Sequence, residues 1–453
     1  MVAGRAHMAT LEQPHRVLIV GLGATGLSCA RFLSAHGVAI AVTDTRSHPP
    51  GLEALRETLP DVAVFLDGLD EQALRSADEV VLSPGVARRT PQIAAALARG
   101  TPVVGDVEIF ARYARAPVVA VTGSNGKSTV TTLIAGMARA AGRDARAGGN
   151  LGTPALDLLG DGVPDLYVLE LSSFQLECTE SLVPEVAVVL NLSADHMDRY
   201  RDLDEYAAAK ARILRRAKVQ VVNADDPVVA AMADPARRVI RFTSAVPQAD
   251  EFGLREYAGE DWLAHGAEPL VRAAALRLPG RHNRANALAA LAAGTALGLA
   301  PEAMGEVLGR FSGLAHRTQW VGERDGVVWY NDSKGTNVGA TTAALEGFDA
   351  PVVLIAGGDG KGADFSALRA PVAARARAVV LFGRDAPLIA RALEGTVPLH
   401  TAGDLDEVVR TAGTLARPGD VVLFSPACAS FDRFRNYEER GARFMEAVRR
   451  WLQ

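Results

Sequence analysis

The strongest chemical signal in the sequence is the segment TGSNGKST at residues 122–129, which directly follows the apolar run PVVAV and opens a helical stretch. Successive backbone N–H groups, a lysine and a serine hydroxyl at this spacing can hold the phosphates and the Mg²⁺ of a nucleoside triphosphate. The residues that would do so are Gly123, Ser124, Asn125, Gly126, Lys127, Ser128 and Thr129. The segment departs from the general phosphate-loop pattern because Val121 stands where the first glycine is expected. A regulatory nucleotide switch without transfer chemistry is the alternative.

Two more segments, LELSSFQ at 169–175 and NLSADHMD at 191–198, each end an apolar run. If both runs are strands of the sheet that carries the phosphate loop, their polar side chains meet at the edge where phosphates lie. Glu170 and His196 then become candidate metal ligands, although a lone strand-end Glu or His is more often a satisfied structural group. Lys210 lies among alanines in the helical stretch YAAAKARILRRA, and its residue type alone favours a solvated surface lysine.

Three polar loops in the last third of the chain define a second candidate site. They are NDSKGTN at 331–337, GGDGKG at 357–362 and SPACASFD at 425–432, and each follows an apolar run. Polar loops at the carboxyl ends of neighbouring parallel strands indicate a ligand site. Cys428 lies in the third loop, but no nearby His or Asn completes a nucleophile pair, so we assign it a structural role.

Near the N-terminus, GLGATG at 21–26 follows an apolar run, and the next run ends at Asp44. Taken alone, this is the dinucleotide fingerprint, with glycines against a pyrophosphate and an acid on a ribose hydroxyl. An NAD-dependent dehydrogenase would account for it but would leave the rest of the chain unexplained. Because Thr45 and Arg46 follow at once as a second anion clamp, we interpret the loop as binding a diphosphate that is not necessarily NAD.

The elements that must position these residues are short Val, Ile and Leu runs that alternate with Ala-rich helical stretches. This alternation predicts parallel strands buried on both faces. Breaks near residues 105 and 313 predict an α/β protein of three domains: a Rossmann-like domain at 15–105, a central P-loop ATPase-like domain with a mostly parallel sheet at 106–313, and a Rossmann-like domain at 314–453. We expect residues 1–14 to be a poorly ordered extension, and residues 244–280 to be irregular strands or hairpins that cover the central sheet.

Composition narrows the class of partner. A net charge of −5 and a pI near 6.0 give no general field for a polyanion, so nucleic acid is a poor default partner. Three widely spaced cysteines argue against both a disulfide framework and a structural zinc site. The sequence shows no secretory signal and no apolar run of about 18 residues. We therefore expect a cytoplasmic protein that does not bind membranes. We also expect a monomer, although the sequence itself does not give the oligomeric state.

Together these elements resemble the Mur ligase family. The resemblance rests on TGSNGKST, ELSSFQLE, DHMDRY, AAAKARI, GRHNRANALAA, the His-Arg pair at 316–317, NDSKGTN and GGDGKGADF, which run in unbroken order from about residue 15 to residue 453. Within the family, GLGATGLSCARFL, the Asp-Thr-Arg at 44–46, the Ser-Pro-Gly at 83–85 and SPACASFDRFRNYEERG are similar to the members that add D-glutamate.

The resemblance implies a ligase reaction in peptidoglycan precursor synthesis that consumes ATP, with Mg²⁺ at two sites. The carboxylate of UDP-N-acetylmuramoyl-L-alanine (UDP-MurNAc-L-Ala) would take the γ-phosphoryl group, and the amine of D-glutamate would displace phosphate from the acyl phosphate. Phosphate-loop chemistry suits the first step, which needs positioning and charge neutralisation. The runner-up is another amide ligase of the superfamily, with a different amino acid and a muramoyl or folate acceptor.

The resemblance also assigns roles to individual residues. Lys127 and Ser128 would hold ATP phosphates and Mg²⁺, Glu170 and His196 would ligate the metals, and Lys210 would act as a carbamate. Further ATP contacts would be Asn283, Asn286, Arg317 and Asp332. The UDP-sugar would lie on Thr25, Thr45, Arg46, Ser83, Gly85 and Asn150. D-Glutamate would contact Thr336, Lys361, Ser430 and Tyr437, the last at a position where the family pattern commonly has Phe.

Overall fold

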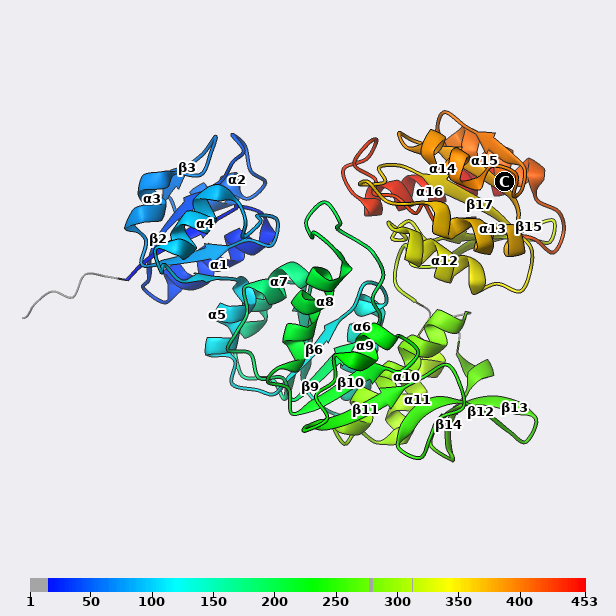
Figure 1. The fold of residues 1–453 in the computed structure, drawn as a ribbon, viewed down its shortest axis with the longest axis horizontal. Coiled ribbons are helices and arrows are strands. Elements are labelled where there is room, and N and C mark those ends of the chain that lie inside the picture. The colour runs from blue at the N-terminus through cyan, green and yellow to red at the C-terminus, as the bar shows by residue number, and fades with distance from the viewer. Residues whose placement is uncertain (1–14, 277–279, 312) are drawn as a thin grey trace, which may run out of the picture. The chain divides into compact units, whose positions relative to one another are not determined.

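The computed structural model describes residues 15–276, 280–311 and 313–453, so the predicted N-terminal extension lies outside the described residues. Three sheets follow one another along the chain, of five, nine and six strands, each alternating with helices (Figure 1). The predicted three-domain α/β class is confirmed. Within the described ranges, no helix combines the length and the hydropathy that crossing a bilayer requires.

The first sheet is parallel throughout and has the order β3-β2-β1-β4-β5. Its strands are β1 (Arg16–Val20), β2 (Ala39–Thr43), β3 (Ala63–Phe65), β4 (Glu79–Leu82) and β5 (Val103–Val104). The helices along this part of the chain are α1 (Ala24–Ala35), α2 (Leu52–Thr58), α3 (Glu71–Ser76), α4 (Pro91–Ala98) and α5 (Asp106–Tyr113). The order reverses at β1, which places the GLGATG loop at the switch point where open α/β sheets bind ligands.

The second sheet has the order β14-β13-β12-β11-β10-β9-β6-β8-β7. Its strands are β6 (Val118–Thr122), β7 (Ala145–Gly149), β8 (Leu166–Glu170), β9 (Val186–Val189), β10 (Val219–Asn223), β11 (Arg238–Phe242), β12 (Glu251–Tyr257), β13 (Glu260–His265) and β14 (Glu268–Arg272). Its helices are α6 (Lys127–Ala140), α7 (Ser173–Glu177), α8 (Leu203–Ala211), α9 (Pro227–Ala231), α10 (Arg281–Ala296) and α11 (Pro301–Arg310), with 3₁₀ turns η1 (Ala155–Leu159), η2 (Arg212–Leu214) and η3 (Ala273–Ala275).

The expected position of residues 244–280, covering the central sheet, is wrong. The described part of residues 244–280 does not cover the central sheet but extends its edge, because β12 pairs with β11 and then continues as an antiparallel β12-β13-β14 ribbon. The ribbon strands mix buried and exposed residues without strict alternation, and the sequence pattern did not indicate which sheet the ribbon would join.

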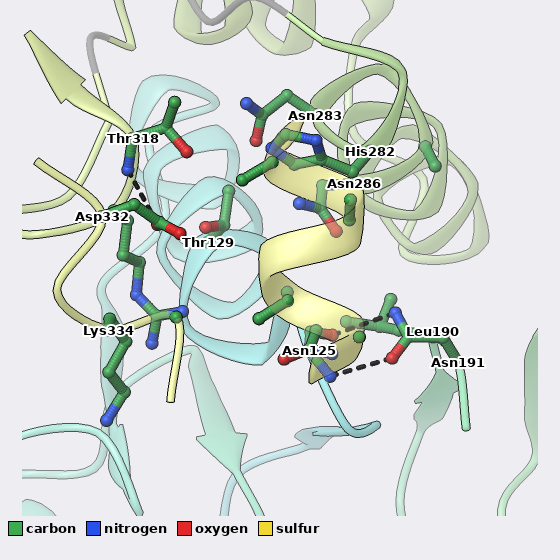
Figure 2. Close-up of a pocket in the computed structure, with 18 of the residues that line it drawn as sticks. Asn125, Thr129, Leu190, Asn191, His282, Asn283, Asn286, Thr318, Asp332 and Lys334 are labelled. Atoms are coloured by element: carbon green, nitrogen blue, oxygen red, sulfur yellow. Dashed lines mark hydrogen bonds between the residues drawn. The ribbon is translucent and has the colours of Figure 1, made fainter. Parts of the chain in front are cut away.

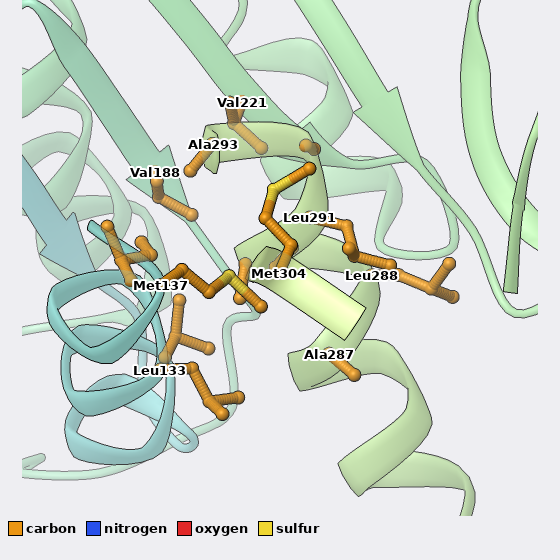
Figure 3. Close-up of a cluster of buried hydrophobic side chains, with 14 of the residues drawn as sticks. Leu133, Met137, Val188, Val221, Ala287, Leu288, Leu291, Ala293 and Met304 are labelled. Carbon is orange, nitrogen blue, oxygen red and sulfur yellow. The ribbon is translucent and has the colours of Figure 1, made fainter. Parts of the chain in front are cut away.

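The core of the central domain forms where α6, α10 and α11 pack on the sheet (Figure 3). Helix α10 is rich in alanine, which favours the helix and presents little side-chain bulk. The helices can therefore approach closely: a Cβ built on Gly294 of α10 would lie 2.3 Å from the sulfur of Met304 in α11. Figure 3 shows Leu288 and Leu291 of α10 in the same cluster as Val188 and Val221 of the sheet.

The third sheet has the order β15-β16-β20-β17-β18-β19, with only the β15-β16 pair antiparallel. Its strands are β15 (Gln319–Arg324), β16 (Val327–Asn331), β17 (Val352–Gly357), β18 (Ala376–Phe382), β19 (Leu399–Thr401) and β20 (Val421–Phe424). The helices are α12 (Val338–Glu346), α13 (Arg369–Arg375), α14 (Ala386–Leu393), α15 (Leu405–Leu415) and α16 (Tyr437–Leu452), and η4 (Ser366–Leu368) is a 3₁₀ turn. Because β20 lies between β16 and β17, the loops that follow these three strands are neighbours.

Contacts group the chain into two compact units. The first contains the residues up to Arg115 together with Gly148–Val163 and Ser172–Leu182, and the second contains the remainder. The first unit thus includes α5, η1 and α7, which the sequence assigned to the central domain. The physical cause lies within this unit: α5 packs on η1, and the Gly105 amide donates to the Cys178 carbonyl over 3.0 Å.

A buried carboxyl at the start of α5 gives this unit a pH-dependent stability. Burial raises the pKa of Asp106 from 3.8 to about 6, against a hydrogen bond from Gln175 Nε2 at 3.2 Å that lowers it. The folded unit therefore favours the protonated form. The stabilisation that this preference contributes is complete below about pH 4 and is lost as the pH rises through 6.

We predict that Asp106→Asn removes this loss. The variant should gain about 3 kcal/mol relative to the parent between pH 4 and pH 7, from about two pKa units at 1.36 kcal/mol each. Hydrogen exchange of the α5 amides, corrected for the intrinsic rate at each pH, measures the difference. The exposed substitution Asp61→Asn controls for the change in net charge, and a difference that does not change with pH would contradict the prediction.

Candidate functional site

The phosphate loop joins β6 to α6 and depends on two glycines with positive φ, Gly123 at +153° and Gly126 at +83°. The Lys127 side chain folds back over the loop, and its Nζ donates to the carbonyls of Gly123 and Ser124, both over 2.9 Å. Burial lowers the pKa of Lys127, and the nearby Glu170 carboxylate opposes this shift. The loop and its lysine thus form a preorganised concave cradle with the N-terminus of α6.

Ser128, Glu170 and Arg317 meet beside this cradle. The Ser128 hydroxyl donates to Glu170 Oε2, at the end of β8, and accepts from Arg317 Nη2 over 2.6 Å. Glu170 is buried, and Arg317 comes from the segment that precedes β15. The structure therefore brings together three residues that lie far apart in the sequence.

Lys210 of α8 is buried and is not the solvated lysine that its residue type favoured. Its Nζ donates to the Gly123 carbonyl over 2.8 Å and lies 4.4 Å from the centre of the Tyr206 ring. Burial lowers the pKa of Lys210 well below its ordinary value, and the positive charge of Lys127 lowers it further. A lowered pKa increases the share of the neutral amine, which is the nucleophilic form of lysine.

His196 lies in the loop after β9 with φ at +57° and is half-exposed, while its neighbour Asp195 points to the C-terminal sheet. Asp195 pairs with Lys361 Nζ over 3.3 Å and accepts from Asn337 Nδ2 over 3.2 Å. The same Asn337 nitrogen lies 3.3 Å from Asn125 Oδ1 of the phosphate loop. The sequence did not single out Asp195 or Asn337 for a role, although both lie in segments that it marked.

A cavity of about 330 Å³ opens beside the phosphate loop. In Figure 2, Asn125 and Asn191 lie at one end and His282 and Asn283, from the start of α10, lie at the other. Asn286, one turn further along α10, packs on the loop, because a Cβ on Gly126 would lie 2.3 Å from its Oδ1. The four further nucleotide candidates Asn283, Asn286, Arg317 and Asp332 all line this cavity.

Asp332 is a buried carboxyl in the cavity wall. It accepts from the Thr318 amide over 3.0 Å and from the Ser425 hydroxyl over 2.7 Å. Burial raises its pKa to about 6, although these hydrogen bonds lower it. Lys334, which the sequence did not propose, also lines the cavity; burial lowers its pKa to about 8, and its Nζ lies 3.8 Å from the centre of the Tyr437 ring.

The three C-terminal loops are bonded to one another. The Asp359 and Ala429 backbones exchange two hydrogen bonds of 3.0 and 2.7 Å, and the Ala427 amide donates to Gly335 over 2.8 Å. Three of the four amino-acid candidates, Thr336, Lys361 and Ser430, lie in these loops, and Tyr437 is the first residue of α16. Burial raises the pKa of the Cys428 thiol to about 12, which fits the structural role assigned to it.

Arg440 of α16 bonds to two of these loops. The sequence analysis did not identify this residue. It is fully buried and donates to Ser333 Oγ, the Ser333 carbonyl and the carbonyls of Cys428 and Ala429, over 2.7 to 3.1 Å. Burial lowers its pKa to about 10. The sequence signal for a buried arginine would have been its position on the apolar face of an amphipathic helix.

In the first unit, Asp44 faces inward and is not a free ribose ligand. Its carboxylate accepts from the Leu22 amide over 2.7 Å and from two nitrogens of Arg46 over 2.9 and 2.7 Å. Burial alone would raise its pKa, but these hydrogen bonds lower it to about 2. The acid therefore orients the glycine loop and the Arg46 guanidinium, and this disfavours the dinucleotide interpretation.

The glycine loop itself is tightly packed. Ser83 Oγ donates to the Gly21 carbonyl over 2.9 Å, and a Cβ on Gly26 would lie 1.9 Å from the same oxygen. All six UDP-sugar candidates belong to this unit: Thr25, Thr45, Arg46, Ser83, Gly85 and Asn150.

Of the four candidate metal ligands, Ser128, Glu170, His196 and Lys210, only Glu170 is a carboxylate. Within the described ranges, no three His, Cys, Asp or Glu side chains cluster closely enough to hold a metal. The oxygens of Glu170 and Ser128 suit Mg²⁺, which typically binds one or two carboxylates and substrate phosphates. Unmodified Lys210 does not suit it, because an ammonium repels a cation.

Comparison with known proteins agrees with this geometry. Residues 15–105 match the family model described as Mur ligase MurD-like, N-terminal domain; residues 121–294 match the Mur ligase middle domain; and residues 316–428 match the Mur ligase glutamate ligase domain. The chain is similar to the UDP-N-acetylmuramoylalanine--D-glutamate ligases of Nitrosococcus oceani, with 57% identity over 96% of both chains, and of Methylococcus capsulatus, with 52% identity over 97% of this chain and 95% of the relative.

Solved structures with a similar fold have low sequence identity. UDP-N-acetylmuramate-alanine ligase MurC from Thermotoga maritima superposes with a TM-score of 0.60 at 19% identity, covering 96% of this chain and 99% of that one. MurF from Acinetobacter baumannii gives 0.61 at 17% identity, over 95% and 93% of the chains. At these identities the match supports the fold alone.

We predict that Gly126→Ala weakens ATP binding at least about tenfold, because alanine is strained by 1–2 kcal/mol at a left-handed φ and its Cβ would strike Asn286. Equilibrium titration with Mg²⁺ and ATP measures this effect. Gly142→Ala is the matched control, since Gly142 has nearly the same φ of +81° at the other end of α6 and open space around it. It should lower stability but leave the dissociation constant unchanged. If both variants weakened ATP binding equally, the prediction would be wrong.

Proposed function

The chain belongs to the Mur ligase family, and on that premise we propose that it joins D-glutamate to UDP-MurNAc-L-Ala, with ATP converted to ADP and phosphate. The observation that carries this function is the 57% identity over 96% of both chains to a relative of that name. The enzyme is a UDP-N-acetylmuramoylalanine--D-glutamate ligase of peptidoglycan precursor synthesis. Ligases with another amino acid or a folate acceptor, and an NAD-dependent dehydrogenase, are not favoured.

The reaction has two steps. A carboxylate oxygen of the alanyl group attacks the γ-phosphorus and ADP leaves, which gives an acyl phosphate. The D-glutamate nitrogen, after losing a proton, then attacks the acyl carbon, and phosphate leaves as the amide forms. Phosphoryl transfer needs little covalent chemistry from the protein, so catalysis rests on positioning and charge stabilisation.

We assign the nucleotide to the cradle and its adjoining cavity. The phosphates would lie against the loop at residues 123–129 and the Lys127 ammonium. The Ser124 and Asn125 amides already donate to Asn191 over 2.9 and 2.8 Å, so other amides of the loop would receive the phosphates. Lys127 must then exchange its loop carbonyls for phosphate oxygens. Arg317, which already donates to Ser128, would neutralise the charge that develops on the transferred group. Asn283, Asn286 and Asp332 line the nucleoside part.

Glu170 and Ser128 would hold Mg²⁺, with His196 and a carbamate on Lys210 serving a second Mg²⁺. The metal neutralises phosphate charge when it is bound. Lys210 suits the modification because its amine is buried with a lowered pKa. The neutral amine adds to CO₂ and releases one proton, which gives a carbamate anion that can accept a hydrogen bond or bind a metal.

The remaining candidate residues would bind the two other substrates, UDP-MurNAc-L-Ala and D-glutamate. Thr25, Thr45, Arg46, Ser83, Gly85 and Asn150 would contact the UDP-sugar. D-Glutamate has two carboxylates, so its site requires separated donors. Lys361 would provide one on its loop, and Thr336, Ser430 and Tyr437 would provide the others from two further loops and the start of α16. We further propose that the enzyme acts as a monomer in the cytoplasm, with no membrane association.

For Lys210 we predict that activity falls when bicarbonate and CO₂ are removed and returns when they are added. Lys210→Ala should lose most activity and regain part of it with a small carboxylate such as acetate. Lys210→Arg keeps a cation but cannot form the carbamate, so it should be inactive and should not respond to bicarbonate. A Lys210→Gln enzyme that turns over like the parent would show that the lysine is only structural.

For D-glutamate we predict that phosphate release, at saturating UDP-MurNAc-L-Ala and ATP, prefers it to L-glutamate, L-alanine, glycine, L-lysine and meso-diaminopimelate. Lys361→Ala should lower kcat/KM for D-glutamate about ten- to a hundredfold, which corresponds to one lost charge-assisted bond of 1.5–3 kcal/mol. Its effect on the KM for ATP should be small.

The control for Lys361→Ala is Lys218→Ala, which removes an exposed lysine paired with Glu185 over 2.7 Å. It should leave kcat/KM unchanged. Preference for any other amino acid in the panel would defeat the assignment of D-glutamate while leaving the ligase chemistry in place.

A further inference from the structure

The first unit contains a second cavity, of about 380 Å³, which takes no part in the proposed reaction. All the residues that line it belong to this unit, and they come mainly from β5, α5 and the segment at the end of α7. None of the residues assigned above to ATP, the UDP-sugar, D-glutamate or a metal lines it. Its size is that of a small-molecule site, for which volumes start at about 300 Å³.

One wall of this cavity is the open edge of a sheet. The order of the first sheet ends at β5, so one side of this strand has no neighbouring strand in the sheet. The Val80 amide of β4 donates to the Pro102 carbonyl over 2.9 Å, so the N–H and C=O of the next residue, Val103, point away from β4. Two residues further on, the Gly105 amide on that outer side donates to the Cys178 carbonyl. Within the described ranges, no hydrogen bond reaches the Val103 N–H or C=O.

Arg88 brings a cation to the same cavity. Its Nη1 donates to the Glu177 backbone carbonyl, which does not neutralise its charge, and in the described part of the chain no carboxylate forms an ion pair with it. The other arginine of the cavity, Arg112, is already paired: its Nη2 lies 2.8 Å from Glu79 and its Nε 3.6 Å from Glu108. Arg88 is therefore the guanidinium that a carboxylate of a ligand would meet.

Two glutamates keep the cavity from being a general anion site. Glu177 and Glu180 also line it, and Glu180 is exposed. Glu108 adds little to their charge, because its Oε2 accepts from the Glu180 and Ser181 amides over 2.7 and 2.8 Å while Arg112 lies beside its other oxygen. A ligand with charges of both signs is thus favoured over a simple anion.

We propose that this cavity binds a zwitterionic peptide of about three small residues. The C-terminal carboxylate pairs with Arg88, and the N-terminal ammonium lies near Glu180. The middle residue is extended along Val103 and exchanges two backbone hydrogen bonds with it, as when a peptide adds a strand to a sheet edge. Leu97 and Pro102 line the cavity with apolar surface that suits small side chains. The proposal is independent of the ligase reaction and adds a second ligand site to the chain.

The test is calorimetric titration of the full chain with trialanine and three analogues that each lack one feature. Trialanine should bind with a saturable isotherm. Trialanine amide, without the carboxylate, should bind about ten- to a hundredfold more weakly. N-acetyl-trialanine, without the ammonium, and trialanine N-methylated on its middle residue should each bind about three- to tenfold more weakly.

A variant assigns the carboxylate to its partner. Arg88→Gln should bind trialanine at least about tenfold more weakly and should no longer distinguish trialanine from its amide, as expected when both changes remove the same interaction. Arg89→Gln is the matched control, because Arg89 is the exposed neighbour and does not line the cavity. It should bind all four peptides like the parent.

Cys178 supplies a second readout that does not depend on heat. Its thiol lines the cavity, whereas Cys29 and Cys428 are fully buried. Saturating trialanine should protect Cys178 from alkylation by iodoacetamide, in proportion to the occupancy found by titration, and mass spectrometry of the digested chain measures the modified fraction.

The site is refuted if the parent shows no saturable binding of trialanine, if trialanine amide binds equally well, or if bound peptide leaves the alkylation of Cys178 unchanged. The peptide comparison on the parent protein stands even if Arg88→Gln fails to fold. In each case the proposed ligase function is unaffected, because it assigns no residue of this cavity, and its own test is phosphate release with D-glutamate.

Discussion

The burial of lysine and arginine side chains is the constraint on which the rest of the second unit depends. Lys127 and Lys210 both bond to the Gly123 carbonyl, and Arg317 lies on Ser128 beside Glu170. Burial lowers the pKa of both lysines, which shows that the fold holds them against their preference for water. The apolar core of the central sheet must supply the free energy that gathers them. The negative charge of a ligand with several phosphates would compensate these buried cationic groups, so the unliganded site already favours an anionic ligand.

The phosphate loop and the strand-end loops were predictable because their signals are local. A strand, a glycine turn and a helix N-terminus lie within about ten residues, and parallel strands place their carboxyl ends at one edge. The Asp195–Lys361 pair was not predictable, since 166 positions separate its members. The burial of Lys210 also depends on tertiary packing, as its helix has no apolar stripe that would indicate a buried face.

The first unit shows how one motif can serve two purposes. An acid after the second strand is typical of ribose recognition, yet Asp44 is bonded to its own loop and to Arg46. Sequence alone cannot distinguish these two roles, because both need a carboxylate at the same register. The hydrogen-bond partners of Asp44 distinguish the two roles. Both of its carboxylate oxygens already accept hydrogen bonds from the protein, so they are not available to a sugar hydroxyl.

The buried Arg440 has a consequence for how the chain is made. The Ser333 loop that it anchors lies 107 positions earlier in the sequence. At ordinary rates of synthesis, of about 5 to 20 residues per second, the ribosome takes roughly 5 to 20 seconds to cover that distance. During this interval the loop carbonyls of the nascent third domain have only water as a partner, and its half-built sheet lacks β20 at its centre. The loop cluster of this domain therefore cannot be completed until the last helix of the chain has been made.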